Sequence, residues 1–109
     1  MIKVCKFGGS SVADADQIRK VKAILDSDKE RSVVVVSAPG KRFSGDEKVT
    51  DMLLSCASLS EKGQSCEEEF RKIAQRYRDI AKGLGLEESI LDEELEDVRK
   101  NIDGGKGRD

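Results

Sequence analysis

A lysine, two glycines and two serines stand close together near the start of the chain, in the stretch KFGGSS. These residue types suit the binding of a phosphate group. Glycines let backbone amides approach an anion closely, serine hydroxyls donate hydrogen bonds, and a lysine ammonium can follow the charge of a phosphoryl group during its transfer. An ordinary tight turn beside a surface lysine is the alternative interpretation. The candidate phosphate-binding residues are Lys6, Gly8, Gly9, Ser10 and Ser11, and Lys6 is also the candidate catalytic residue.

Two further hydroxyl side chains follow in positions that suit ligand binding. Ser37 ends an apolar run in SVVVVSAPG, and ligands of parallel sheets bind beyond the carboxyl ends of the strands. The loops Gly8–Ser11 and Ser37–Gly40 are therefore expected at the same edge of one sheet. Thr50 lies early in a predicted helix, where a hydroxyl and unpaired amides can hold a carboxylate. A strand-ending turn at Ser37 and a helix cap at Thr50 remain the alternatives.

Several kinds of chemistry find no support in this sequence. The glycine stretch matches neither the dinucleotide fingerprint nor the Walker-type phosphate loop. The chain has no histidine, which excludes Ser-His-Asp and Cys-His catalysis and most zinc sites. We predict no metal site, and we interpret four acidic residues as caps or first-turn residues of helices. These are Asp14, Asp16, Asp46 and Asp51.

Composition indicates a reducing compartment and no bias toward nucleic acid or membranes. The net charge is −2, so neither nucleic acid nor a membrane is indicated as a partner. The chain up to Ser60 is slightly basic and the remainder is acidic, which favours the first part for an anionic ligand. The cysteines Cys5, Cys56 and Cys66 form no CxxC pair, and the N-terminus lacks a long apolar run. We therefore expect a cytoplasmic protein.

The apolar pattern predicts a strand, a helix and a second strand within the first forty residues. Residues 1–7 read as a strand, and Asp14 followed by Gln17 resembles a capping box at the start of a helix that fades over Asp26–Glu30. The valines of Ser32–Gly40 predict a strand buried on both faces, typical of a parallel sheet between helices. Two parallel strands cannot bury themselves, so either the chain is a fragment or a partner supplies more strands.

The remaining residues predict an exposed, mobile loop and three amphipathic helices. The loop covers Lys41–Lys48, and a flexible connector is expected at Gly104–Gly107. The first helix is expected from about Glu47 to Lys62, and the other two are marked by apolar stripes. The stripe residues are Val49, Leu53 and Cys56 in the first helix, Phe70, Ile73, Ala74, Tyr77, Ile80 and Leu84 in the second, and Leu91, Leu95, Val98 and Ile102 in the third.

Three motifs in register resemble the N-terminal part of the aspartokinases, a group within the amino acid kinase family. They are KFGGSSVAD at Lys6–Asp14, VVVVSAPG at Val33–Gly40 and KVTDML at Lys48–Leu53. The resemblance implies an α/β fold, a three-layer αβα sandwich with a mainly parallel sheet. It also implies that residues 1–109 are the N-terminal portion of a catalytic domain, with no ACT regulatory domain in this chain.

The activity that the resemblance implies is transfer of the γ-phosphoryl group of ATP to the side-chain carboxylate of L-aspartate. The product is 4-phospho-L-aspartate, on the way to lysine, threonine and methionine, and Mg²⁺ would be bound through ATP. Lys6 would contact the ATP phosphates, Gly8, Gly9 and Ser10 would form the phosphate-facing loop, and Ser11 would lie beside it. Ser37 and Thr50 would contact the aspartate substrate.

The same resemblance implies a homo-oligomer for the complete enzyme and little or no activity for this chain by itself. Ser10 stands where many aspartokinases have threonine, which keeps the hydroxyl group. One alternative is a truncated, non-catalytic kinase half that acts as a binding or interaction module. Another is a related phosphotransferase that acts on a different carboxylate or on a carbamate.

Overall fold

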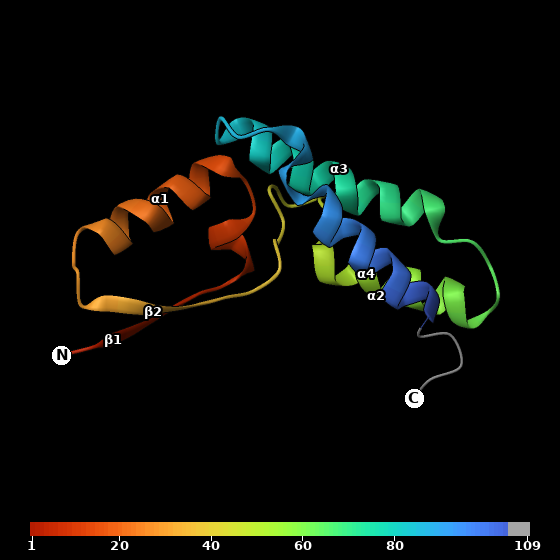
Figure 1. The fold of residues 1–109 in the computed structure, drawn as a ribbon, viewed down its shortest axis with the longest axis horizontal. Coiled ribbons are helices and arrows are strands. Elements are labelled where there is room, and N and C mark those ends of the chain that lie inside the picture. Colours follow the sequence, from red (N-terminus) through yellow and green to blue (C-terminus); the bar gives the residue numbers. More distant parts are fainter. Residues whose placement is uncertain (105–109) are drawn as a thin grey trace. The chain divides into compact units, whose positions relative to one another are not determined.

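The computed structural model describes residues 1–104, which divide into two units, with the boundary along the chain between Val49 and Thr50. The first unit contains strand β1 (Lys3–Phe7), the 3₁₀ turn η1 (Gly9–Val12), helix α1 (Ala15–Asp26) and strand β2 (Arg31–Val36) (Figure 1). Most of the connector expected at Gly104–Gly107 lies outside the described residues.

The two strands are parallel neighbours, which confirms the predicted strand–helix–strand unit. The pairing runs from Val4 opposite Val33 to Phe7 opposite Val36, with a register shift just after Lys3. Helix α1 connects them and begins where the sequence predicts, because the Asp14 carboxylate accepts a hydrogen bond of 2.9 Å from the backbone N–H of Gln17. The sequence thus encodes this crossover locally.

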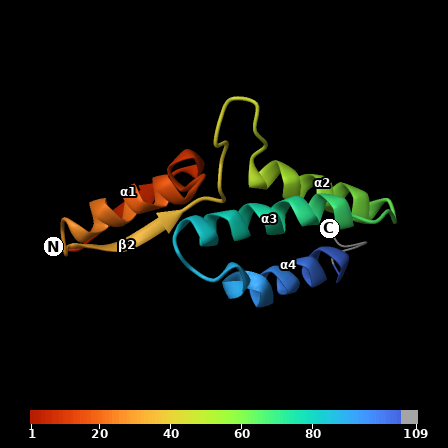
Figure 2. The same ribbon diagram turned by 90° about the horizontal axis from the view of Figure 1, so that it is seen from above.

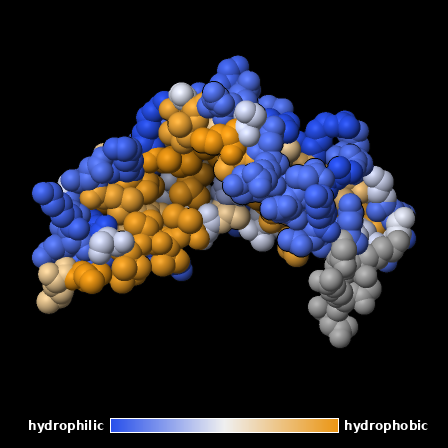
Figure 3. Space-filling view, in the orientation of Figure 1, coloured by the Kyte–Doolittle hydropathy of each residue, from blue (hydrophilic) through white to orange (hydrophobic). Residues whose placement is uncertain are grey.

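The valines of β2 are more exposed than the sequence predicts. Val33, Val34, Val35 and Val36 are between 42% and 58% exposed, and Val4 on β1 is 67% exposed. Helix α1 lies along one face of the strands (Figure 2), and Figure 3 shows apolar side chains uncovered over this part of the unit. The predicted burial on both faces is therefore wrong for the described chain, because its two strands have no further strand beside them.

The second unit is helical, as the sequence predicts. It contains α2 (Val49–Glu61), α3 (Glu67–Gly83), the 3₁₀ turn η2 (Glu88–Leu91) and α4 (Asp92–Gly104). Gly63 and Gly85 follow α2 and α3 with positive φ angles of 74° and 78°. Glycine adopts such angles without strain, which explains why these two positions end the helices.

The helical core differs in detail from the predicted apolar stripes. In α2, Met52 and Ser60 are buried whereas Leu53 is only half-buried, and in α4 Val98 is 39% exposed. The buried Ser60 hydroxyl donates a hydrogen bond of 3.3 Å to the carbonyl of Ile102 and so links α2 to α4. A polar residue at a core position cannot be recognised from a stripe of apolar residues.

Two buried cysteine thiols complete this core. Cys56 in α2 and Cys66 at the start of α3 are both free and buried. Burial and the neighbouring Cys66 raise the pKa of the Cys56 thiol to about 11. Cys56 is therefore protonated near neutral pH and behaves as a small apolar residue.

Candidate functional site

The loops that follow the two strands meet at the carboxyl edge of the sheet, as the sequence predicts. The backbone N–H of Ser37 donates to the carbonyl of Phe7 at 3.2 Å. The N–H of Gly40 donates to the carbonyl of Gly9 at 2.8 Å. These two bonds bring Gly8–Ser11 and Ser37–Gly40 into one backbone structure within the first unit.

Gly9 and Gly40 pack backbone against backbone at this edge. A Cβ atom on Gly40 would lie 2.8 Å from the carbonyl carbon of Gly9, and one on Gly9 would lie 3.0 Å from the carbonyl oxygen of Ala38. Real Cβ atoms essentially never approach backbone as closely as the first distance, and the second is tighter than most Cβ contacts and requires a small shift of its neighbour. A Cβ on Gly8 would meet nothing within 4 Å, so Gly8 leaves space that a ligand can enter.

This contact predicts a specific cost for a single methyl group. Gly40→Ala should destabilise the protein by about 1–3 kcal/mol, because the added carbon overlaps backbone atoms that cannot rotate away. Gly45→Ala is the matched control, since its Cβ would meet only the Phe43 ring, at 3.9 Å. Urea unfolding followed by circular dichroism measures both. Equal stability of the two variants would show that the loops separate easily.

Lys6 lies on β1 opposite Val35, one residue before the strand ends, and its side chain is exposed. No carboxylate among residues 1–104 forms an ion pair with it. Lys3 on the same strand is different, because its ammonium contacts the Asp28 carboxylate at 2.6 Å and lowers the pKa of that group. The charge of Lys6 is therefore available to an anionic ligand.

The turn η1 directly after β1 is a feature that the sequence analysis missed. The N–H of Ser11 donates to the carbonyl of Gly8 at 3.1 Å, while Ser10 is exposed and Ser11 half-buried. This turn separates the glycines from α1, whose own amino end is capped by Asp14. The amides nearest the strand end are consequently those that open η1, and not those of α1.

Ser37 and Thr50 both have exposed side chains, but they fall in different units. Ser37 follows β2 directly and belongs with the glycine loops. Thr50 is the second residue of α2 and is preceded by Val49, whose N–H donates to the carbonyl of Pro39 at 3.0 Å. The structure thus brings six predicted residues into the first unit and leaves Thr50 at the start of the second.

The loop Lys41–Lys48 is closed by an ion pair that the sequence analysis did not recognise. The Asp46 carboxylate accepts hydrogen bonds from Arg42 at Nε (2.6 Å), at Nη2 (3.0 Å) and at the backbone N–H (3.0 Å). The Asp46 side chain is 7% exposed, and a further bond joins its N–H to the carbonyl of Phe43. The expectation of a mobile loop took no account of this pair, whose only sequence signal is an arginine four residues before an aspartate.

The ion pair has a definite dependence on pH. Hydrogen bonds from Arg42 hold the pKa of Asp46 well below its ordinary value. A lowered pKa in the folded state contributes stability above the pKa of the unfolded chain, and this contribution is lost as pH falls through the lowered value. The pair is therefore fully formed near neutral pH.

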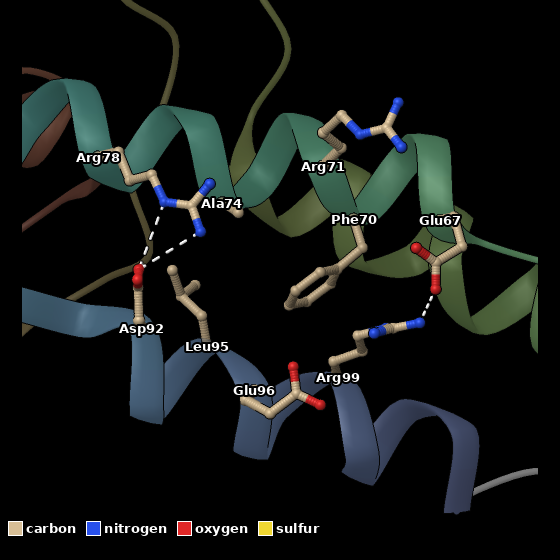
Figure 4. A pocket seen from close by; sticks show the side chains of 9 residues that line it. All are labelled: Glu67, Phe70, Arg71, Ala74, Arg78, Asp92, Leu95, Glu96 and Arg99. Carbon is tan, nitrogen blue, oxygen red and sulfur yellow. Dashed lines mark hydrogen bonds and ion pairs between the residues drawn. The ribbon is translucent and has the colours of Figure 1, made fainter. Parts of the chain in front are cut away.

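A separate groove of about 200 Å³ lies between α3 and α4 (Figure 4). It contains none of the predicted site residues. Arg78 contacts Asp92 at 3.4 Å across it, and Arg99 pairs with Glu67. Arg71, also on the groove, contacts Glu68 at 2.9 Å. Each of these arginines has an acidic partner, so the positive charges along the groove between α3 and α4 are already neutralised. Its lining comprises Glu67, Phe70, Arg71, Ala74, Arg78, Asp92, Leu95, Glu96 and Arg99.

Two other kinds of site were sought among residues 1–104. No group of three or more cysteine, aspartate or glutamate side chains there is arranged to hold a metal ion. The helices of the same residues include none with the length and hydropathy needed to cross a bilayer. The joined loops at the sheet edge are therefore the candidate site on which the functional interpretation depends.

A parallel strand pair that carries a lysine and a glycine loop at its carboxyl edge suits the binding of a phosphate group. Residues 1–100 match the amino acid kinase family, and the chain belongs to that family.

Within the family, the chain is similar to aspartokinases. It is 43% identical over 105 residues to Aspartokinase 3 of Bacillus subtilis, which covers 96% of this chain and 23% of that protein. It is 36% identical over 102 residues to the Aspartokinase of Chlamydia trachomatis, covering 89% and 21% respectively. The crystal structure of Clostridium acetobutylicum aspartate kinase superposes with a TM-score of 0.88 and 44% identity, over 94% of this chain and 23% of that one. The chain thus spans less than a quarter of the length of these relatives.

Proposed function

We propose that this chain is the N-terminal part of an aspartate kinase catalytic domain. The reaction transfers the γ-phosphoryl group of ATP to the side-chain carboxylate of L-aspartate and yields 4-phospho-L-aspartate and ADP. The observation that carries the proposal is the joining of the Gly8–Ser11 and Ser37–Gly40 loops beside Lys6, in a chain that resembles aspartokinases. The complete domain in this proposal is a cytoplasmic, homo-oligomeric three-layer αβα sandwich, and its further strands cover the exposed valines of β2.

The proposed roles follow from the charge and position of each group. Lys6 contacts the terminal phosphates of ATP and balances the charge on the transferring phosphoryl group. Gly8, Gly9 and Ser10 present amides and a hydroxyl to the phosphates, with Ser11 beside them. These residues would take ATP with Mg²⁺ bound to it, and the metal ion would supply neutralisation of phosphate charge. One oxygen of the aspartate carboxylate attacks the γ-phosphorus as the bond to ADP breaks, and no general base is needed because this carboxylate is ionised near pH 7.

A direct assay tests the proposal on the full-length natural polypeptide that contains residues 1–109, called the full-length chain below. It is incubated with Mg-ATP and L-aspartate, and the acyl phosphate is trapped with hydroxylamine while ADP release is followed. L-Asparagine, which lacks the acceptor carboxylate, is the control substrate. ADP release that does not depend on aspartate would refute the proposed activity.

Thr50 offers a test of the aspartate-binding side. Thr50→Val in the full-length chain should raise the KM for aspartate about tenfold, because a hydrogen bond to a charged group contributes about 1.5–3 kcal/mol. The KM for ATP should stay close to the wild-type value. Steady-state kinetics with each substrate varied in turn measures both constants.

The controls separate substrate binding from helix capping. Thr50→Ser keeps the hydroxyl and should restore the aspartate KM, whereas Ser55→Ala on the exposed side of α2 should leave it unchanged. If Thr50→Val lowers the unfolding midpoint but not the affinity for aspartate, Thr50 only stabilises the first turn of α2 and has no place in the substrate site.

The exposed valines favour one second candidate, a non-catalytic interaction module. In that case the strand pair binds a partner polypeptide through its uncovered valines, and no phosphoryl transfer occurs. A full-length chain that co-purifies with a strand-donating partner and shows no aspartate-dependent ADP release would favour this candidate over the kinase.

A further inference from the structure

We propose that Gly40 is a positioning residue for the phosphate groups of ATP, because it holds the phosphate-facing loop Gly8–Ser11 from behind. The inference rests on the proposed function and extends it to a residue to which the resemblance gives no role. Gly40 is buried, whereas Gly8 and Ser10 are exposed. Gly40 therefore contacts the loop and not the ligand, and all of these residues lie in the first unit.

The first observation is how closely Gly40 approaches the loop. A Cβ atom on Gly40 would lie 2.8 Å from the carbonyl carbon of Gly9 and 3.0 Å from the backbone nitrogen of Ser10. Gly40 thus packs against the peptide group that joins Gly9 to Ser10. The N–H of Gly40 also donates to the carbonyl of Gly9 at 2.8 Å. A residue with a side chain could not make both contacts without moving this peptide group.

The hydrogen bond from Gly40 fixes the direction of that peptide group. The Gly9–Ser10 peptide is trans, so its carbonyl and its N–H point in opposite directions. Because the carbonyl of Gly9 points to the N–H of Gly40, the N–H of Ser10 points away from it. The carbonyl of Gly8 is also held within the chain, by the N–H of Ser11 at 3.1 Å. The loop therefore offers amides to a phosphate and keeps its carbonyl oxygens, which would repel the phosphate, engaged elsewhere.

Gly40 is itself held firmly on the side away from the loop. The peptide group between Pro39 and Gly40 has both polar groups bonded, because its N–H donates to Gly9 and its carbonyl accepts a bond of 3.0 Å from the N–H of Val49. Pro39, Gly40 and Val49 are all buried, and the proline ring fixes the φ angle of Pro39. A loop held by such a support is ordered before the nucleotide arrives, which lowers the entropic cost of binding.

Ser37, proposed to contact aspartate, is fixed by a separate contact. Its N–H is bonded to the carbonyl of Phe7 at 3.2 Å, as a continuation of the strand pairing. A change at Gly40 should therefore disturb the phosphate-facing loop more than it disturbs Ser37. The positioning role thus predicts unequal effects on the two substrates, whereas a general loss of stability predicts none on either KM.

The test measures the two substrates separately in the full-length chain. Gly40→Ala should raise the KM for ATP about tenfold, because the added methyl group turns the Gly9–Ser10 peptide and weakens a hydrogen bond to a charged phosphate. The KM for aspartate should change less than about twofold. Isothermal titration calorimetry without aspartate should show a similar loss of affinity for Mg-ATP and little loss for AMP, which lacks the terminal phosphates.

Two other glycines provide the control and the second variant. Gly45→Ala is the matched control, since its Cβ would meet only the Phe43 ring and neither KM should change. Gly9→Ala serves if Gly40→Ala does not fold. Its Cβ would lie 3.0 Å from the carbonyl oxygen of Ala38 and 3.1 Å from the nitrogen of Gly40, so it strains the same contact from the other side and should give the same ATP-selective loss.

The outcomes separate this inference from the proposed function. A lower unfolding midpoint with both KM values unchanged is what a purely structural role of Gly40 predicts, and it would overturn the positioning role. An equal loss of affinity for ATP and AMP would overturn it too. A wild-type full-length chain without aspartate-dependent ADP release overturns the proposed function. Normal wild-type turnover with an unchanged ATP affinity in Gly40→Ala overturns this inference alone.

Discussion

Replacing Lys6 with alanine in the full-length chain should lower kcat for aspartate phosphorylation by about 10²–10³-fold, the usual cost of removing one group that stabilises transition-state charge. The expected loss is this large because phosphoryl transfer depends on positioning and on cations rather than on covalent chemistry. Lys6 stands on a paired strand beside the joined glycine loops, and no carboxylate in the described part of the chain competes for its ammonium.

The same substitution should have little effect on folding. The Lys6 side chain is exposed, and surface substitutions of this kind change stability by about 0.5 kcal/mol or less. Steady-state assays that vary ATP and aspartate separately give kcat and both KM values. Urea unfolding gives the free energy of unfolding. A large drop in kcat with an unchanged unfolding curve would assign the effect to the reaction.

Two further variants serve as controls for Lys6. Lys3→Ala removes a cation from the same strand, but this cation is paired with Asp28 and Glu30, so kcat should stay normal. Lys6→Arg keeps the positive charge with a different shape and should retain part of the activity. An alanine variant with wild-type kcat would remove Lys6 from the mechanism.

The 109-residue chain by itself should produce no detectable 4-phospho-L-aspartate. Its two strands leave the valines of β2 between 42% and 58% exposed, which is far from the burial typical of a central parallel strand. It also spans only 23% of Aspartokinase 3 of Bacillus subtilis. In the proposed kinase the site needs further strands beside β2, and without them the nucleotide would not be held in a reactive position.

This second expectation is tested with the hydroxylamine assay under conditions in which the full-length chain turns over. Circular dichroism of the isolated chain shows whether its helices form, so that inactivity can be separated from unfolding. Adding the rest of the full-length chain as a separate polypeptide should restore turnover if it covers the strands. Aspartate-dependent turnover by the isolated chain would contradict the expectation.

Local signals explain most of what the sequence predicted correctly. The valine run specified β2, and the pair Asp14 and Gln17 specified the start of α1. Each of these signals depends only on residues that are close together in the sequence, and such residues can be read directly from it. The position of the two loops at one edge also followed, because parallel strands place their carboxyl ends together.

Features that depend on distant or alternative partners were not predictable in the same way. The contact of Gly9 with Gly40 joins residues from two loops. The ion pair of Arg42 with Asp46 forms in place of contacts that both side chains could make with water, and the sequence does not show which of the two is preferred. The turn η1 has no apolar period that would reveal it. The roles of Lys6, Ser37 and Thr50 stay predictions, and the variants described above test them.

The uncovered valines also bear on how this part of the protein behaves in solution. Val33–Val36 form an uncharged β-branched run on a strand with an open edge, the composition that promotes pairing between copies of a chain. When these valines are exposed to solvent, β-sheet aggregation between copies of the chain competes with correct folding. This competition becomes stronger as the protein concentration rises. Covering this strand therefore protects solubility, and in the proposed kinase it would also complete the catalytic domain.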